Sequence, residues 1–205
     1  IIIFIAAIND IPSFVKGPDK EVNEDAGVCS FSGWATDIHR GPSTATDENS
    51  QVLTFQVTAA HPELFKVKPA ISADGTLTFT PFPDASGSTQ VTVVLKDSGG
   101  TLNGGIDTTE EQTFTITIHE VNDVPSFMCG PDQNIEEDSD AQTVVNWATY
   151  ISPGNESELG QSLDFIVTVD NPDLFSVQPA ISSDGTLTYT PAENVNGMAT
   201  VTVQL

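Results

Sequence analysis

The sequence predicts an all-β protein made of Greek-key β-sandwich domains joined end to end. Apolar residues fall at every second position in several short runs, such as Leu53, Phe55 and Val57, which is typical of half-buried strands. Turns rich in Gly, Pro, Asp and Asn separate these runs, and no stretch has helical spacing. The chain also repeats itself, because residues 9–14 (NDIPSF) return as residues 122–127 (NDVPSF). Internal repetition of this kind predicts tandem domains.

The repeat extends well beyond this first motif. Glu24–Asp25 returns as Glu137–Asp138, at the same offset of 113 positions that takes residue 9 to residue 122. After a three-residue deletion the offset is 110, so residues 74–78 (DGTLT) return as residues 184–188. The repeated segments therefore cover both halves of the chain.

The repeat also predicts the domain boundaries. Residues 9–121 are interpreted as one complete repeat, and residues 122–205 as a second repeat that is incomplete at its C-terminal side. Residues 1–8 (IIIFIAAI) occupy the place of the last strand of a preceding repeat. We therefore expect a window on a longer array of domains.

The expected strands follow the alternating runs in order. In the first repeat they lie near residues 20–23, 28–34, 53–57, 65–67, 77–79, 91–95 and 114–118. In the second repeat the matching runs are residues 163–167, 187–189 and 201–205. About seven strands in ~100 residues is the size of an immunoglobulin-like sandwich, which can bury its own core. Trp34 and Trp147 fall in equivalent strand positions and are expected in these cores, while Asp74–Gly75 is expected to form a hairpin turn.

Composition narrows the function before any motif is weighed. The chain has 29 acidic residues and 6 Lys plus Arg, giving a formal net charge of -23, which argues against nucleic acids and anionic membranes as partners. A hydrophobic content of 38% with regular alternation is too high for a disordered acidic tail. Bound cations would reconcile the charge with a folded protein. The apolar residues 1–8 are too short to span a bilayer, so no membrane insertion is expected.

The linker between the repeats carries a family resemblance. Residues 120–125 (EVNDVP) resemble the cadherin inter-domain linker DxNDNxP, with Glu for the first Asp and Val for the second Asn. With its GPD, NEDAG, GWAT and DGTLTFTP motifs, the whole unit resembles the cadherin-like repeats of large bacterial surface and adhesin proteins. The resemblance covers nearly all of the chain. It implies Ca²⁺ as the cofactor, an extracellular or cell-surface location, and neighbouring repeats of the same chain as partners.

The predicted topology brings acidic residues together where the chain leaves the first repeat. In a seven-strand sandwich the turn after the first strand, the end of the fifth strand and the departing linker share one end. Ca²⁺ prefers six to eight hard oxygens at about 2.4 Å, and carboxylates this close need a cation to stay ionised together. The resemblance assigns calcium ligation to Glu24, Asp25, Asp84, Glu120, Asn122 and Asp123. A solvated turn at Glu24–Asp25 and a simple turn opener at Asn122–Asp123 are the alternatives.

A similar site is expected where the chain enters each repeat. Asn9 and Asp10 form the upstream linker, and Asp97 matches the acidic ligand of the cadherin pattern AxD. Asp37 is a weaker candidate, and the DxD pair that cadherins place in its loop is absent. At the exit end of the second repeat, Glu137 and Asp138 are the ligands that match Glu24 and Asp25. There Asn194 replaces Asp84. The number of ions per junction is therefore open.

Two further features lie outside the shared pattern. Cys29 lies four residues beyond Asp25, at the expected exit end of the first sandwich, and Cys129 lies just after the linker, at the entry end of the second, which predicts an inter-domain disulfide in an oxidising environment. The alternative is two unrelated free thiols. Asn155–Glu156–Ser157 fits the N-glycosylation pattern, so Asn155 is a candidate acceptor.

The sequence favours a structural function over catalysis. It contains no GxSxG, HExxH, P-loop or CxxC motif, so no enzyme activity is expected. The interpretation is a calcium-stiffened rod or spacer in cell adhesion, a biofilm matrix or a surface filament. Identical chains and surface glycans are further candidate partners. The alternative is a carbohydrate-binding or spacer module of a secreted hydrolase, which for glycan binding would need an exposed aromatic platform.

Overall fold

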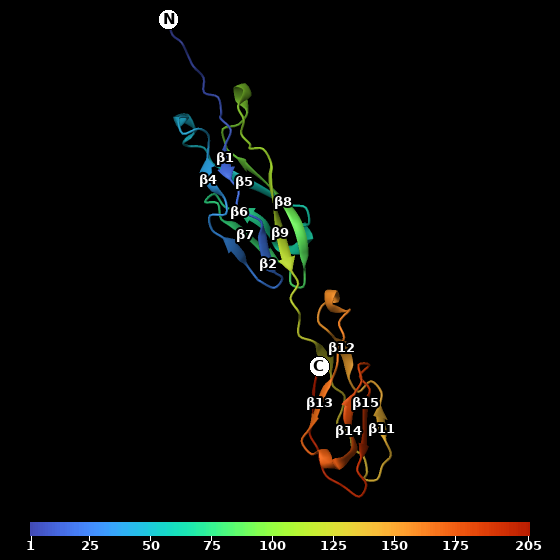
Figure 1. Ribbon diagram of the computed structural model, residues 1–205. Coiled ribbons are helices and arrows are strands. Elements are labelled where there is room, and N and C mark those ends of the chain that lie inside the picture. The colour runs from blue at the N-terminus through green and yellow to red at the C-terminus, as the bar shows by residue number, and fades with distance from the viewer. The chain divides into compact units, whose positions relative to one another are not determined.

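The computed structural model describes residues 1–205 and is all-β, as the sequence predicts (Figure 1). Its helices are short 3-10 turns, and none is long and apolar enough to cross a bilayer. The chain divides into two compact units, Ile1–Val121 and Asn122–Leu205. Each unit has its own hydrophobic core and is described separately.

The first unit contains nine strands in three sheets. These are β1 (Ser13–Val15), β2 (Lys20–Asn23), β3 (Cys29–Phe31), β4 (Thr36–His39), β5 (Thr54–Ala59), β6 (Phe65–Ile71), β7 (Leu77–Pro81), β8 (Gly87–Lys96) and β9 (Gln112–His119). The sheet orders are β2-β9-β8-β5, β3-β7-β6 and β1-β4. Only β2 and β9 pair in parallel. The short helices are η1 (Thr46–Glu48), η2 (Pro62–Leu64) and η3 (Leu102–Gly104).

The core of the first unit follows the predicted alternation. The inward residues of β7, β8 and β9 are at most 3% exposed; they are Leu77, Phe79, Val91, Val93, Leu95, Phe114, Ile116 and Ile118. Trp34 is 4% exposed, and its ring centroid lies 4.4 Å from that of Phe114. The recurrence of apolar residues at every second position therefore identified the core face of these strands. Trp34 is a core residue, as predicted.

The turn between β6 and β7 is the predicted hairpin. The two strands pair antiparallel, and Gly75 has a φ of +83° that favours glycine. An added Cβ there would also lie 2.0 Å from the carbonyl oxygen of Ala35. Asp74 accepts hydrogen bonds from the Ser72 hydroxyl and the Thr76 N–H. This Asp therefore closes a turn, which agrees with its assignment as a turn residue.

The second unit contains seven strands. These are β10 (Ser126–Met128), β11 (Gln142–Val144), β12 (Thr149–Ser152), β13 (Ile166–Val169), β14 (Phe175–Ile181), β15 (Leu187–Pro191) and β16 (Val201–Gln204). They form the sheets β11-β15-β14, β10-β12 and β13-β16, with the short helices η4 (Glu156–Glu158) and η5 (Pro172–Leu174). Its most buried apolar residues are Ala148, Ile181, Leu187 and Tyr189. Trp147 is half-buried and packs against them.

Two expectations about strands differ from the structure. Residues 1–8 form no strand and are exposed, because no neighbouring strand pairs with their backbone N–H and C=O groups. Conversely, β1 and β4 were not predicted. They are three and four residues long and their pairing contains an irregularity, so an alternating pattern has too little length to appear.

Candidate metal centre

Glu24 is the most buried acidic residue at the end of the first unit where the chain leaves it. It follows β2 directly and is 2% exposed because β2 pairs in parallel with β9. Its backbone N–H donates to the carbonyl of His119 at 2.9 Å, and its Oε1 accepts the N–H of Val121 at 2.9 Å. Its Oε2 is buried without a hydrogen-bond partner. Glu24 thus holds the departing chain and leaves one carboxylate oxygen unsatisfied.

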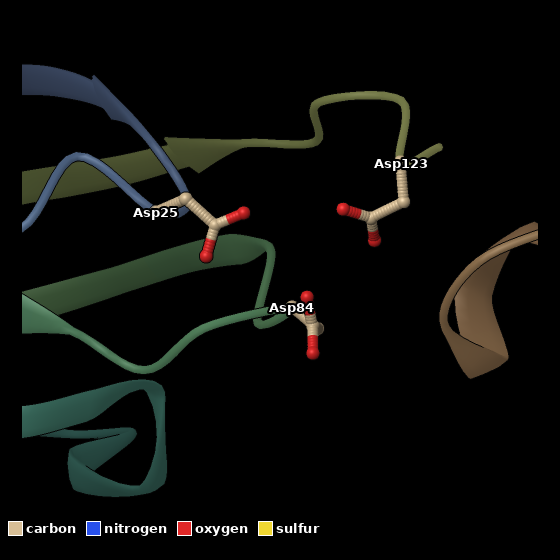
Figure 2. A group of neighbouring side chains, drawn as sticks. All are labelled: Asp25, Asp84 and Asp123. Carbon is tan, nitrogen blue, oxygen red and sulfur yellow. The ribbon is translucent and has the colours of Figure 1, made fainter. Parts of the chain in front are cut away.

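Asp25 and Asp84 lie beside this residue in two turns of the first unit. Both adopt left-handed backbone conformations, with φ of +58° and +57°, in which Asp is among the more tolerant residues. A carboxylate oxygen of Asp25 lies within 4.8 Å of one of Asp84, and both residues are exposed (Figure 2). We call Glu24, Asp25 and Asp84 the C-terminal acidic cluster. The predicted convergence of the turn after β2 with the turn after β7 is therefore present.

Asp123, the third residue labelled in Figure 2, belongs to the second unit. It is the second residue after Val121, whose N–H is bound by Glu24. Two residues span at most about 7 Å, so the chain connection alone keeps the Asp123 backbone near the cluster. Glu120, at the end of β9, is exposed.

This donor set fits a hard divalent cation. Carboxylate oxygens are the preferred ligands of Ca²⁺, and several of them can surround one ion. The unpartnered Oε2 of Glu24 is a second sign, since a buried polar atom normally has a partner. A cation there would supply the missing counter-charge.

The end where the chain enters the first unit contains the other predicted residues. Asn9 donates through Nδ2 to Asp97 Oδ1 at 3.0 Å and to the carbonyl of Ile106 at 2.8 Å. Asp97 is 3% exposed, and its Oδ2 is buried without a partner. The backbone N–H of Asp10 donates to Oε1 of Glu48. The structure therefore brings Asn9, Asp10 and Asp97 together, whereas Asp37 lies in β4 and is exposed.

The second unit repeats this arrangement around its first residues. The Asp123 N–H donates to Glu158 Oε1 at 2.9 Å, and the Asp123 carboxylate accepts from Asn155 Nδ2 at 2.8 Å. The Oδ1 of Asn122 accepts from Gln161 Nε2 at 2.9 Å, as the Oδ1 of Asn9 accepts from Gln51. The contacts of the linker pair with the buried Glu and with the Gln three residues after it therefore recur in both units, whereas the other contacts differ.

Glu137 and Asp138 lie in a more open turn than their counterparts. Both side chains are exposed, and Asp138 has a φ of +64°. Its Oδ1 accepts the backbone N–H of Asn194 at 2.7 Å. Asn194 stands where Asp84 stands in the first unit, so this turn has one carboxylate fewer.

Sequence reasoning missed Glu48 and Glu158. Each is 2% exposed and has one unpartnered carboxylate oxygen, Oε2. A signal existed, because Glu48 and Gln51 return as Glu158 and Gln161 at the offset of 110. The surrounding turns differ in length, which hid this match.

Both cysteines are free thiols in this structure, and the inter-domain disulfide stays a prediction. The Cys29 side chain belongs to the core of the first unit, where burial raises the pKa of its thiol. Cys129 is exposed in the second unit.

The candidate glycosylation residue has structural contacts instead. The amide nitrogen of Asn155, the atom that would carry a glycan, donates to Asp123, while its Oδ1 accepts the backbone N–H of Ser157 at 2.8 Å. Asn155 thereby caps η4. These contacts place Asn155 within the Asp123 arrangement.

Comparison with known proteins gives little to add to this geometry. No protein-family model matches the chain, and no curated protein matches it. A solved structure of the human desmocollin-1 ectodomain is similar over 94% of this chain and 35% of its own, with 15% sequence identity and a TM-score of 0.32. The chain thus spans about a third of that ectodomain. A likeness this weak carries no argument about function, which is argued from the residues themselves.

Proposed function

We propose that this chain is a non-catalytic structural segment of an extracellular surface protein, in which Ca²⁺ stiffens the connection between successive β-sandwich units. The observation that carries the proposal is the C-terminal acidic cluster, where buried Glu24 holds the departing chain and keeps one oxygen unpartnered. A cation bound there would tie the linker to the unit that precedes it.

The proposed ligands come from two places. Glu24, Asp25 and Asp84 supply carboxylates from the first unit, and Glu120, Asn122 and Asp123 supply oxygens from the linker. Ca²⁺ would neutralise these like charges and restrict the two residues that follow Val121. Extracellular modules bind Ca²⁺ with dissociation constants of about 0.1 to 1 mM, which suits conditions outside a cell.

The net charge of -23 supports a role for cations throughout the chain. Neighbouring repeats are the proposed partners, and cell adhesion, a biofilm matrix or a surface filament is the proposed setting. A glycan-binding alternative has less support, because among the Trp and Tyr side chains Trp34 and Tyr189 are buried and Trp147 is half-buried, which leaves Tyr150 as the exposed one.

The proposal is tested by Asp123→Asn in the full chain, with Asp132→Asn as the matched control at an exposed position of the same unit. We expect Asp123→Asn to weaken calcium binding about tenfold by removing a charged ligand, while both units stay folded. Calorimetric titration and small-angle scattering with Ca²⁺ or a chelator would measure affinity and inter-unit flexibility. If the inter-unit flexibility were changed neither by calcium nor by Asp123→Asn, the proposal would be contradicted.

A further inference from the structure

The carboxylate of Glu158 is buried, and only one of its two oxygens accepts a hydrogen bond. Glu158 is the last residue of η4 and is 2% exposed. Oε1 accepts the N–H of Asp123 at 2.9 Å, whereas Oε2 is buried without any hydrogen-bond partner. An ionised carboxylate is costly to bury unless it is paired.

The second unit has no side chain that could neutralise this charge. Residues 122–205 contain 13 Asp plus Glu and no Lys, Arg or His, since all 6 Lys and Arg and all 3 His precede residue 122. A buried charge in proteins is paired or coordinates a metal. Within this unit only the second possibility exists.

The unpartnered oxygen faces the side chain of the linker aspartate. A Cβ added to Gly154 would lie 2.0 Å from Glu158 Oε2 and 2.5 Å from the Cβ of Asp123. The absence of a side chain at Gly154 thus leaves room where Oε2 and the Asp123 side chain approach the same backbone. Carboxylates of two residues are therefore available to one ion.

The first unit contains the same arrangement. Glu48 Oε1 accepts the N–H of Asp10, and its Oε2 is buried without a partner. A Cβ at Gly41 would lie 2.0 Å from that oxygen and 3.0 Å from the Cβ of Asp10. Arg40 precedes Gly41, whereas Pro153 occupies its place before Gly154. The unpartnered oxygen persists in both copies, so its presence does not depend on this arginine.

We propose that Glu158 and Glu48 are ligands of a hard divalent cation, Ca²⁺ in the extracellular setting, held inside each unit with Asp123 and Asp10. The inference rests on the proposed calcium function but assigns it a second kind of site, which one unit forms without the unit before it.

The test uses the full chain with Glu158→Gln, and Glu156→Gln as the matched control. Glu156 lies in the same turn but is exposed. Gln retains an Oε1 acceptor for the Asp123 N–H and removes only the charge. Calcium is counted by equilibrium dialysis, the amide signal of Gly154 is followed by NMR, and melting is recorded with Ca²⁺ and with a chelator.

We expect the Glu158→Gln variant to bind about one calcium ion fewer than the wild type. Its Gly154 amide signal should not shift when calcium is added. The calcium-induced rise in Tm of the second unit, roughly 5 to 10 °C at a concentration tenfold above Kd, should shrink. In chelator the variant should melt no lower than the wild type, because an unpaired buried charge is gone. Glu156→Gln should behave as the wild type.

Other results overturn the inference in distinguishable ways. An unchanged calcium count, with Tm lowered equally in calcium and chelator, would give Glu158 a purely structural role. Calcium responses at Asp25 and Asp84 without any at Gly154 would remove this site and leave the proposed function intact. A wild-type chain that binds no calcium would remove both.

Discussion

Glu24 and Glu137 occupy the same place in the repeated sequence, each followed by an Asp, but have different environments in the two units. Glu24 is 2% exposed and binds the N–H of Val121, whereas Glu137 is exposed. Glu24 is covered because β2 pairs with β9, whereas residues 132–136 form no strand and the sequence of the second repeat stops before the segment that would match β9. The motif alone therefore does not make the site, since a neighbouring strand is needed to bury the glutamate.

The facing turns differ as well. Asp84 brings a second carboxylate to Asp25, but Asn194 donates its backbone N–H to Asp138 and brings none. The φ values of +57° for Asp84 and +56° for Asn194 are nearly the same, so the backbone is kept while the charge changes. We therefore expect the turns of Asp25 and Asp84 to bind a cation more tightly than the turns of Asp138 and Asn194.

The largest effect is expected from the cores that hold these turns. Leu77→Ala should cost about 3 to 5 kcal/mol, because Leu77 is fully buried, and Leu187→Ala should cost nearer 2 kcal/mol at 6% exposure. Urea unfolding followed by the NMR signals of each unit would measure the difference. Equal costs would show that the two cores support their turns equally well.

Exchanging the differing residue tests the comparison next. Asp84→Asn should weaken calcium binding at the C-terminal acidic cluster about tenfold, since one charged ligand is lost. Asn194→Asp should raise calcium uptake by the second unit, and Asp173→Asn serves as an exposed control. Calorimetric titration measures all three. If Asp84→Asn bound calcium as the wild type does, Asp84 would not be a ligand.

The smallest effect concerns hairpin aspartates that the two units share. The Ser72 hydroxyl and the Thr76 N–H lower the pKa of Asp74, and the same contacts lower that of Asp184. A lowered folded-state pKa contributes stability above the unfolded pKa, and this contribution is lost as pH falls through the folded value. Carboxyl NMR titration should place both midpoints below the ordinary value of 3.8, with no response to calcium. Midpoints that differ between the units or move with calcium would contradict this.

Much of the fold followed from local sequence. The alternation in β7, β8 and β9 identified residues such as Leu77 and Ile116 as core, and Asp74–Gly75 marked its hairpin. By contrast, β1 and β4 were too short to show a period, and residues 1–8 have strand-like composition without a pairing partner. Strand formation by pairing depends on distant residues that a local pattern does not contain.

The candidate site was predictable only where topology determines it. Knowing that two turns share one end of a sandwich was enough to bring Asp25 and Asp84 together. Glu48 and Glu158 were missed because each acts on a linker amide more than thirty residues away, Asp10 or Asp123. The pairing of Cys29 with Cys129 was predicted from the expected ends of the two sandwiches and stays a prediction, while the structure adds that the Cys29 side chain lies in the core of its own unit.

The most direct test of calcium stiffening is ¹⁵N relaxation of the full chain, recorded in Ca²⁺ and in chelator. The amides of the two units report how each unit tumbles. We expect one common tumbling time in calcium and two independent, shorter ones in chelator, because the linker after Val121 is then released. Independent tumbling in both conditions, or common tumbling in both, would contradict the role assigned to calcium.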